Sequence, residues 1–171
     1  MGTRADFYIG RGEGAEWIGS IAWDGYPDGL SCDVLKANSE SEFREAVQEM
    51  AHRDDWTSPE MGWPWPWEDS RTTDYAYAFD GDRVWASCFG YTWCDLAKAV
   101  EEERVMVDKL RAVEAGSPEA EALEDAHEAL QERLWGGINS DDKTAVFPNM
   151  KDKQNVTLGK RSGITFIGRR A

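Results

Sequence analysis

The sequence predicts an α+β fold: a mainly antiparallel sheet with one packed helix and an inserted helical hairpin. Three observations support this prediction. Strand-like segments occur at the start, in the middle and near the end of the chain, an amphipathic helix separates the first two groups, and residues 95–134 change to Ala, Glu, Leu and Lys. The chain has 171 residues, the usual length of one domain. We expect a single domain over 1–171, with 95–135 as a helical-hairpin insertion within it.

The first predicted elements are two strands and a helix. Residues 6–9 and 16–23 are rich in aromatic and β-branched side chains, and the glycines of 10–14 lie between them, which predicts two strands joined by a loop. The helix is expected to run to about residue 53, because this segment holds a capping box and apolar residues at helical intervals, namely Ser39, Glu42, Phe43, Val47 and Met50.

The middle of the chain predicts a loop followed by a β-hairpin. Residues 54–73 carry three prolines and show no sustained period, so we expect a packed loop. Residues 75–79 and 82–89 then read as strands on either side of Asp80 and Gly81. An Asp-Gly pair between two strands is typical of a hairpin with a type I′ turn.

Residues 95–134 predict two helices joined by a short turn. Gly116, Ser117 and Pro118 supply a helix stop, an N-cap and a first-turn proline. Apolar residues form one stripe on each side of this turn: Leu96, Val100, Met106, Val107, Leu110 and Val113 before it, and Leu123, Ala126, Leu130 and Leu134 after it. Strand-like pieces return at 145–147, 155–158 and 163–167, so the two helices are expected as an excursion from one sheet.

The net charge of −14 is unevenly distributed along the chain. Residues 95–134 hold 5 basic and 12 acidic side chains, whereas residues 143–171 hold 7 basic and 1 acidic. A strongly acidic body repels nucleic-acid phosphate and attracts basic protein surfaces. We therefore expect a protein partner with a basic surface and no direct binding of nucleic acid, with solubility as the alternative use of this charge.

The cysteines and the hydropathy of the chain indicate the cytosol. Cys32, Cys88 and Cys94 make an odd number without metal-ligand spacing, which favours a reducing compartment. The start of the chain has no apolar stretch of signal-peptide length, and no later segment approaches the length of a membrane span. We expect a cytoplasmic protein that does not bind membranes, and we expect neither a metal nor a cofactor.

No motif in the chain predicts a catalytic site. Residues 10–15 match the spacing G-x-G-x-x-A, but the segment that follows favours a strand, and Glu13 and Glu16 would repel a pyrophosphate. Of the two histidines, His52 lies near a helix end and His127 lies on an apolar stripe, where packing is the simpler role. We expect a binding protein rather than an enzyme.

The segment Trp63-Pro64-Trp65-Pro66-Trp67 has three possible roles. Its indoles could close one edge of the core, or they could anchor a protein interface, because a proline-stiffened segment loses little entropy when it docks. The third role is a sugar-cleaving cleft, since acidic residues flank the segment: Asp54, Asp55, Glu68, Asp69 and Asp74. We predict Trp63, Trp65 and Trp67 as partner-binding residues.

Carboxylates line the expected outer face of the helical hairpin. Four of them fall together on the second helix, namely Glu121, Glu124, Asp125 and Glu128. We predict that these four residues meet a basic partner surface, and the alternative is an ordinary solvated helix face.

Several segments resemble a set of small uncharacterised proteins of bacteriophages and prophages. The resemblance lies in residues 4–12 (R-A-D-F-Y-I-G-R-G), 63–70 (W-P-W-P-W-E-D-S), 74–79 and 146–148. It covers the two ends and the middle of the chain, whereas the helical hairpin looks like an addition. The resemblance implies a phage accessory protein in a bacterial cytosol, and small acidic phage proteins are often similar to inhibitors of host defence, including anti-CRISPR proteins that imitate DNA with carboxylates.

The leading hypothesis is therefore a phage-encoded acidic binding protein, similar to anti-CRISPR proteins, that inhibits a host or defence protein by occupying a basic, nucleic-acid-binding surface. The second hypothesis is a carboxylate-dependent hydrolase that acts on a glycan. The third is a virion or assembly component. The sequence leaves the partner and the oligomeric state open.

Overall fold

A computed structural model describes residues 2–135 and 143–151 of the chain. Within this part, six strands form one sheet in the order β3-β2-β1-β4-β5-β6. Their bounds are β1 (Ala5–Ile9), β2 (Glu16–Ile21), β3 (Trp56–Thr57), β4 (Tyr75–Phe79), β5 (Val84–Cys88) and β6 (Cys94–Asp95). The central pair β1 and β4 is parallel, and the other neighbours are antiparallel. The predicted α+β fold with a mainly antiparallel sheet is confirmed.

The helices begin at the capping residues that the sequence contains. The α-helices are α1 (Cys32–Leu35), α2 (Glu40–Gln48), α3 (Leu96–Ala112) and α4 (Pro118–Trp135), and short 3₁₀ turns are η1 (Pro27–Gly29), η2 (Glu49–His52) and η3 (Ser70–Thr72). Ser39 Oγ accepts the Glu42 amide at the start of α2, and Asp95 and Ser117 accept the Lys98 and Ala120 amides at the starts of α3 and α4.

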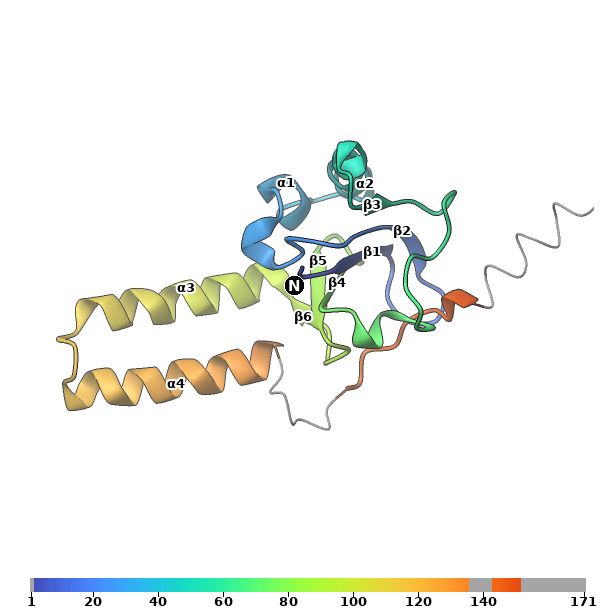
Figure 1. The fold of residues 1–171 in the computed structure, drawn as a ribbon. Coiled ribbons are helices and arrows are strands. Elements are labelled where there is room, and N and C mark those ends of the chain that lie inside the picture. The colour runs from blue at the N-terminus through green and yellow to red at the C-terminus, as the bar shows by residue number, and fades with distance from the viewer. Residues whose placement is uncertain (1, 136–142, 152–171) are drawn as a thin grey trace, which may run out of the picture.

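One face of the sheet packs against α1 and α2, which lie together on that side in Figure 1. The sheet contributes alternate residues such as Phe7, Tyr77 and Phe79, because successive side chains of a strand point to opposite faces. Phe43 and Val47 of α2 fill the space above them, and the Phe43 ring lies 5.9 Å from the Phe79 ring. This is the larger of the two cores that cover the sheet.

The opposite face is covered by irregular chain. Tyr8, Ala76 and Ala78 pack there against the tryptophan loop, residues 58–69, and against a late segment that includes Phe147. The expected strand at 145–147 is not present: Phe147 lies over the Tyr8 ring at 6.0 Å, so the segment covers the face of the sheet and does not extend its edge. The strands expected at 155–158 and 163–167 lie outside the described residues.

The predicted β4–β5 hairpin is present, with its turn one residue later than expected. Gly81 and Asp82 are the two central residues, and both have positive φ (59° and 62°), as a type I′ turn requires. The Asp80 amide donates to the Arg83 carbonyl (3.0 Å), and Phe79 pairs with Val84. The predicted loop at 54–73 also contains two short regular pieces, β3 and η3.

The helices α3 and α4 form an antiparallel arm that projects from the sheet (Figure 1). Their contact is built by Ala99, Leu130 and Leu134, all near the root of the arm. Toward the tip, Leu110 and Leu123 are only half-buried. The arm therefore has one packed seam, and the rest of each helix faces solvent.

Candidate interaction surface

The outer face of α4 carries the four carboxylates that the sequence analysis singled out. Glu121, Glu124, Asp125 and Glu128 are all exposed. At about 100° per residue they fall within roughly a third of the helix circumference, opposite the side that packs on α3. No ion pair or hydrogen bond joins these four side chains to another described residue. We call these four residues the α4 acidic stripe.

The carboxylates of α3 differ, because basic side chains pair with them. Arg104 reaches Glu101 (2.7 Å) and Asp108 (3.1 Å) on its own helix. Arg133 of α4 pairs across the arm with Glu102. The Arg104 guanidinium lowers the pKa of the Glu101 carboxyl. Arginines thus offset several carboxylates on the α3 side of the arm, whereas no described basic residue pairs with the α4 acidic stripe.

The tryptophan loop packs inward. Trp63 is buried, and its indole lies edge-on to Trp17 with 5.2 Å between ring centroids. The Trp65 and Trp67 rings are partly buried and stack on each other at 5.6 Å. All three indole N–H groups donate within the protein: Trp63 to the Trp67 carbonyl (2.8 Å), Trp65 to Asp6 (2.7 Å) and Trp67 to Thr73 (3.1 Å). The loop therefore closes the second core.

A buried polar cluster lies beneath this loop. The fully buried Asp6 carboxylate accepts hydrogen bonds from Ser20 Oγ (2.5 Å), Trp65 Nε1 (2.7 Å) and Ser70 Oγ (2.6 Å). Burial raises the pKa of Asp6, and the three donors counteract part of that rise. Because the cluster is closed to solvent, it can hold the loop on the sheet but cannot meet a substrate. No pattern in the sequence predicts this cluster, and the one available signal is an acidic residue, Asp6, within a predicted strand.

The acidic residues near the tryptophans hold the fold together. Asp55 forms an ion pair with Arg53 (2.7 Å) and accepts hydrogen bonds from the amides of Ala22 (3.1 Å) and Trp23 (2.9 Å). Asp74 pairs with Arg4 at 2.7 Å. Asp69 accepts the Arg71 amide at the start of η3. These three carboxylates therefore have structural partners, and none of them was assigned to this use from the sequence.

The histidines and cysteines show no catalytic arrangement. His127 is half-buried between the two arm helices, and its Nε2 lies 3.8 Å from Glu103 Oε1. The imidazole therefore has a polar neighbour, although His127 belongs to the apolar stripe of α4. Burial raises the pKa values of Cys88 and Cys94 to about 11, which keeps both thiols protonated at neutral pH. In the described ranges, no group of three or more His, Cys, Asp or Glu side chains is placed to hold a metal ion.

The two predicted partner-binding groups do not form one surface. The α4 acidic stripe lies on the arm, and the tryptophan loop lies on the far side of the sheet (Figure 1). Among residues 2–135 and 143–151, no helix combines the length and apolar character that crossing a membrane requires.

Comparisons with protein-family models, curated proteins and solved structures found no match to this chain.

Proposed function

We propose that the chain is a phage-encoded acidic binding protein that inhibits a host or defence protein, in the manner of an anti-CRISPR protein. The α4 acidic stripe would occupy a basic surface of that protein, of the kind that binds nucleic acid. The observation that carries the proposal is the set of four exposed carboxylates without a described ionic partner, on a helix that projects from the body. Complementary charge on two proteins orients them as they approach and raises the rate at which they associate.

The density of charge on the stripe supports the imitation of phosphate. Glu121 and Glu128 are seven residues apart, which is about 10 Å of helix axis, so successive charges of the four are separated by roughly 3.5 Å on average. One strand of DNA carries a phosphate about every 3.4 Å along its axis. The stripe therefore approaches the linear charge of a single strand over a short distance.

The same arrangement argues against a purely solvated face. Glu121 and Asp125, and Glu124 and Glu128, are like charges four residues apart, and such a pair destabilises a helix by about 0.2–0.5 kcal/mol. Elsewhere on the arm, Arg104 and Arg133 offset this kind of repulsion. On the α4 acidic stripe no described residue does so, and a basic partner surface would relieve the repulsion there.

Trp63, Trp65 and Trp67 are not part of the proposed surface, because their indole N–H groups already donate within the body. The glycan-hydrolase alternative gains no specific support either, since the neighbouring Asp55, Asp69 and Asp74 are engaged by arginines and backbone amides.

The test is affinity capture from phage-infected and uninfected bacterial lysates at low and at moderate salt. The bait is the wild-type chain or a variant in which the stripe is reversed by Glu121→Lys, Glu124→Lys, Asp125→Lys and Glu128→Lys. We expect a stoichiometric protein that is retained at low salt, released as salt rises and not captured by the variant, because exposed charges are screened by salt.

A matched control separates the stripe from net charge. Glu13→Lys, Asp33→Lys, Glu45→Lys and Glu49→Lys reverse four exposed carboxylates of the body and change the net charge by the same amount. This control should capture the same protein as the wild type. Capture that is unchanged by the stripe reversal, or lost equally in both variants, would contradict the proposed surface.

A further inference from the structure

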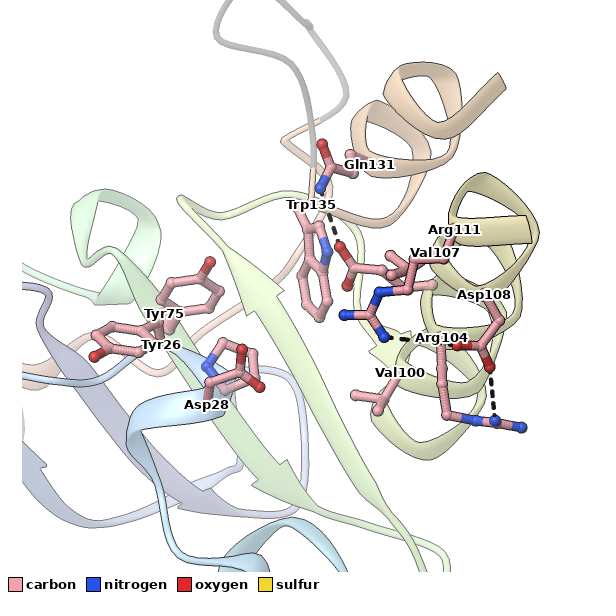
Figure 2. Close-up of a pocket in the computed structure, with 12 residues that line it drawn as sticks. Tyr26, Asp28, Tyr75, Val100, Arg104, Val107, Asp108, Arg111, Gln131 and Trp135 are labelled. Carbon is pink, nitrogen blue, oxygen red and sulfur yellow. Dashed lines mark hydrogen bonds and ion pairs between the residues drawn. The ribbon is translucent and has the colours of Figure 1, made fainter. Parts of the chain in front are cut away.

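A groove of about 610 Å³ lies between the body and the arm, and its arm wall follows α3 from Val100 to Arg111. Figure 2 shows its two walls: Tyr26, Asp28 and Tyr75 on the body, and Trp135 with residues of α3 on the arm. The groove lies between the sheet and the projecting helices, and Gln131 and Trp135 are the α4 residues that line it.

Three aromatic residues line this groove, namely Tyr26, Tyr75 and Trp135. The Tyr75 and Trp135 ring centroids are 6.1 Å apart, with the rings nearly perpendicular at 72°. Tyr26 has 42% of its surface exposed. Tyrosine and tryptophan faces carry negative electrostatic potential and attract a cation placed within about 6 Å.

Two carboxylates of the groove have no lysine or arginine partner among the described residues. Glu103 is half-buried; it accepts a hydrogen bond from Gln131 Nε2 (3.0 Å), and its nearest basic group is His127 Nε2 at 3.8 Å. Asp28 is exposed on the opposite wall and forms no ion pair there. Each wall of the groove thus presents a negative charge beside an aromatic ring.

Two arginines also line the arm wall, and their charge has to be considered. Arg104 is held by Glu101 (2.7 Å) and Asp108 (3.1 Å). Arg111 reaches Asp108 at 3.8 Å and is otherwise exposed. Three carboxylates line the groove (Asp28, Glu103 and Asp108) against these two arginines, so the groove keeps an excess of negative charge.

We propose that this groove binds an arginine side chain of the basic partner. A planar guanidinium can lie against the Tyr26, Tyr75 and Trp135 rings while it donates to a carboxylate, a combination that an ammonium group fits less well. The inference rests on the proposed function for the source of the arginine, and it adds a specific contact to a surface that otherwise acts through charge.

The probe is the peptide N-acetyl-Gly-Arg-Gly-amide, titrated into the ¹⁵N-labelled full chain and followed by the indole N–H resonance of Trp135. We expect a saturable shift that is absent with the uncharged citrulline peptide. Tyr26→Ala and Glu103→Gln should each weaken binding by about 5-fold or more, and Arg111→Ala should strengthen it because a competing cation is removed. Tyr26 is exposed, so its loss should leave the fold intact.

Trp23→Ala is the matched control, because Trp23 is an exposed aromatic residue (54%) outside the groove, and it should bind the peptide as the wild type does. Equal shifts with the arginine and citrulline peptides, or wild-type affinity in both Tyr26→Ala and Glu103→Gln, would overturn the arginine site. Reversal of the α4 acidic stripe should leave the Trp135 shift nearly unchanged. Failure of the arginine-site proposal and failure of the proposed α4 surface are therefore distinguishable.

Discussion

The sheet body and the helical arm use the same residue types in different ways. In the body, both faces of the sheet are covered, and side chains such as Phe7, Tyr8 and Phe43 are fully buried. In the arm, each helix packs along one seam, and Leu110 and Leu123 remain half-buried. The body has the packing of a stable scaffold, whereas much of the surface of the arm is exposed.

Their carboxylates show the same difference. Asp6, Asp55 and Asp74 of the body each accept hydrogen bonds from donors that fix the fold. The α4 acidic stripe forms no such bond with a described residue. Among the described residues, these carboxylates of the body are paired and serve the fold, whereas the α4 acidic stripe is the surface that we propose for a partner.

The largest expected effect tests the core of the body. Phe43→Ala should lower the free energy of unfolding by about 3–5 kcal/mol, because the ring is fully buried against Phe79 and its removal leaves a cavity. Urea unfolding followed by circular dichroism measures this change. A loss below about 1 kcal/mol would mean that α2 packs loosely and that the body resembles the arm.

A smaller effect tests the buried carboxylate. Burial raises the folded-state pKa of Asp6 above its ordinary value of 3.8. At pH values between 3.8 and that raised pKa, Asp6 keeps its proton in the folded state but has lost it in the unfolded state. The stability that Asp6 contributes is therefore complete below about pH 4 and is lost as pH rises through the folded-state pKa.

The measurement is urea unfolding of the wild type and Asp6→Asn in steps from pH 3.5 upward. The wild-type unfolding free energy minus that of the variant should decrease as pH rises and then become constant. A difference that increases with pH would show that the hydrogen bonds from Ser20, Trp65 and Ser70 outweigh the cost of burying the charge.

The smallest effect belongs to the arm. Leu123→Ala removes a half-buried side chain and should cost about 1 kcal/mol, less than a fully buried leucine would. Hydrogen exchange should show faster exchange of α4 amides, while the amides of β1 and β4 exchange as in the wild type, because weakly packed units open independently. Equal acceleration in the sheet would mean that arm and body unfold together.

Much of the fold was predictable because its causes are local. The capping box at Ser39 and Glu42, the Gly116-Ser117-Pro118 helix boundary and the Asp-Gly turn each act over a few residues, and the structure places an element end at each one. The turn moved by one residue because the pairing of Phe79 with Val84, which depends on the whole hairpin, sets the register.

The candidate surface was partly predictable for the same reason. Helical spacing alone places Glu121, Glu124, Asp125 and Glu128 on one face. The groove between the arm and the body could not be predicted from the sequence, because Tyr26, Tyr75 and Trp135 come from three distant segments.

By itself, the sequence determined the fold class, the position of the two arm helices and the acidic character of their outer face, since composition and short-range periodicity carry that information. Only the tertiary structure decided that the tryptophan loop covers the sheet and that Asp6 meets Ser70 across 64 residues of chain. It also decided that Arg133 pairs with Glu102, while no described residue pairs with the α4 acidic stripe. These outcomes depend on contacts between segments far apart in the chain, and no local pattern records which donor will reach which carboxylate.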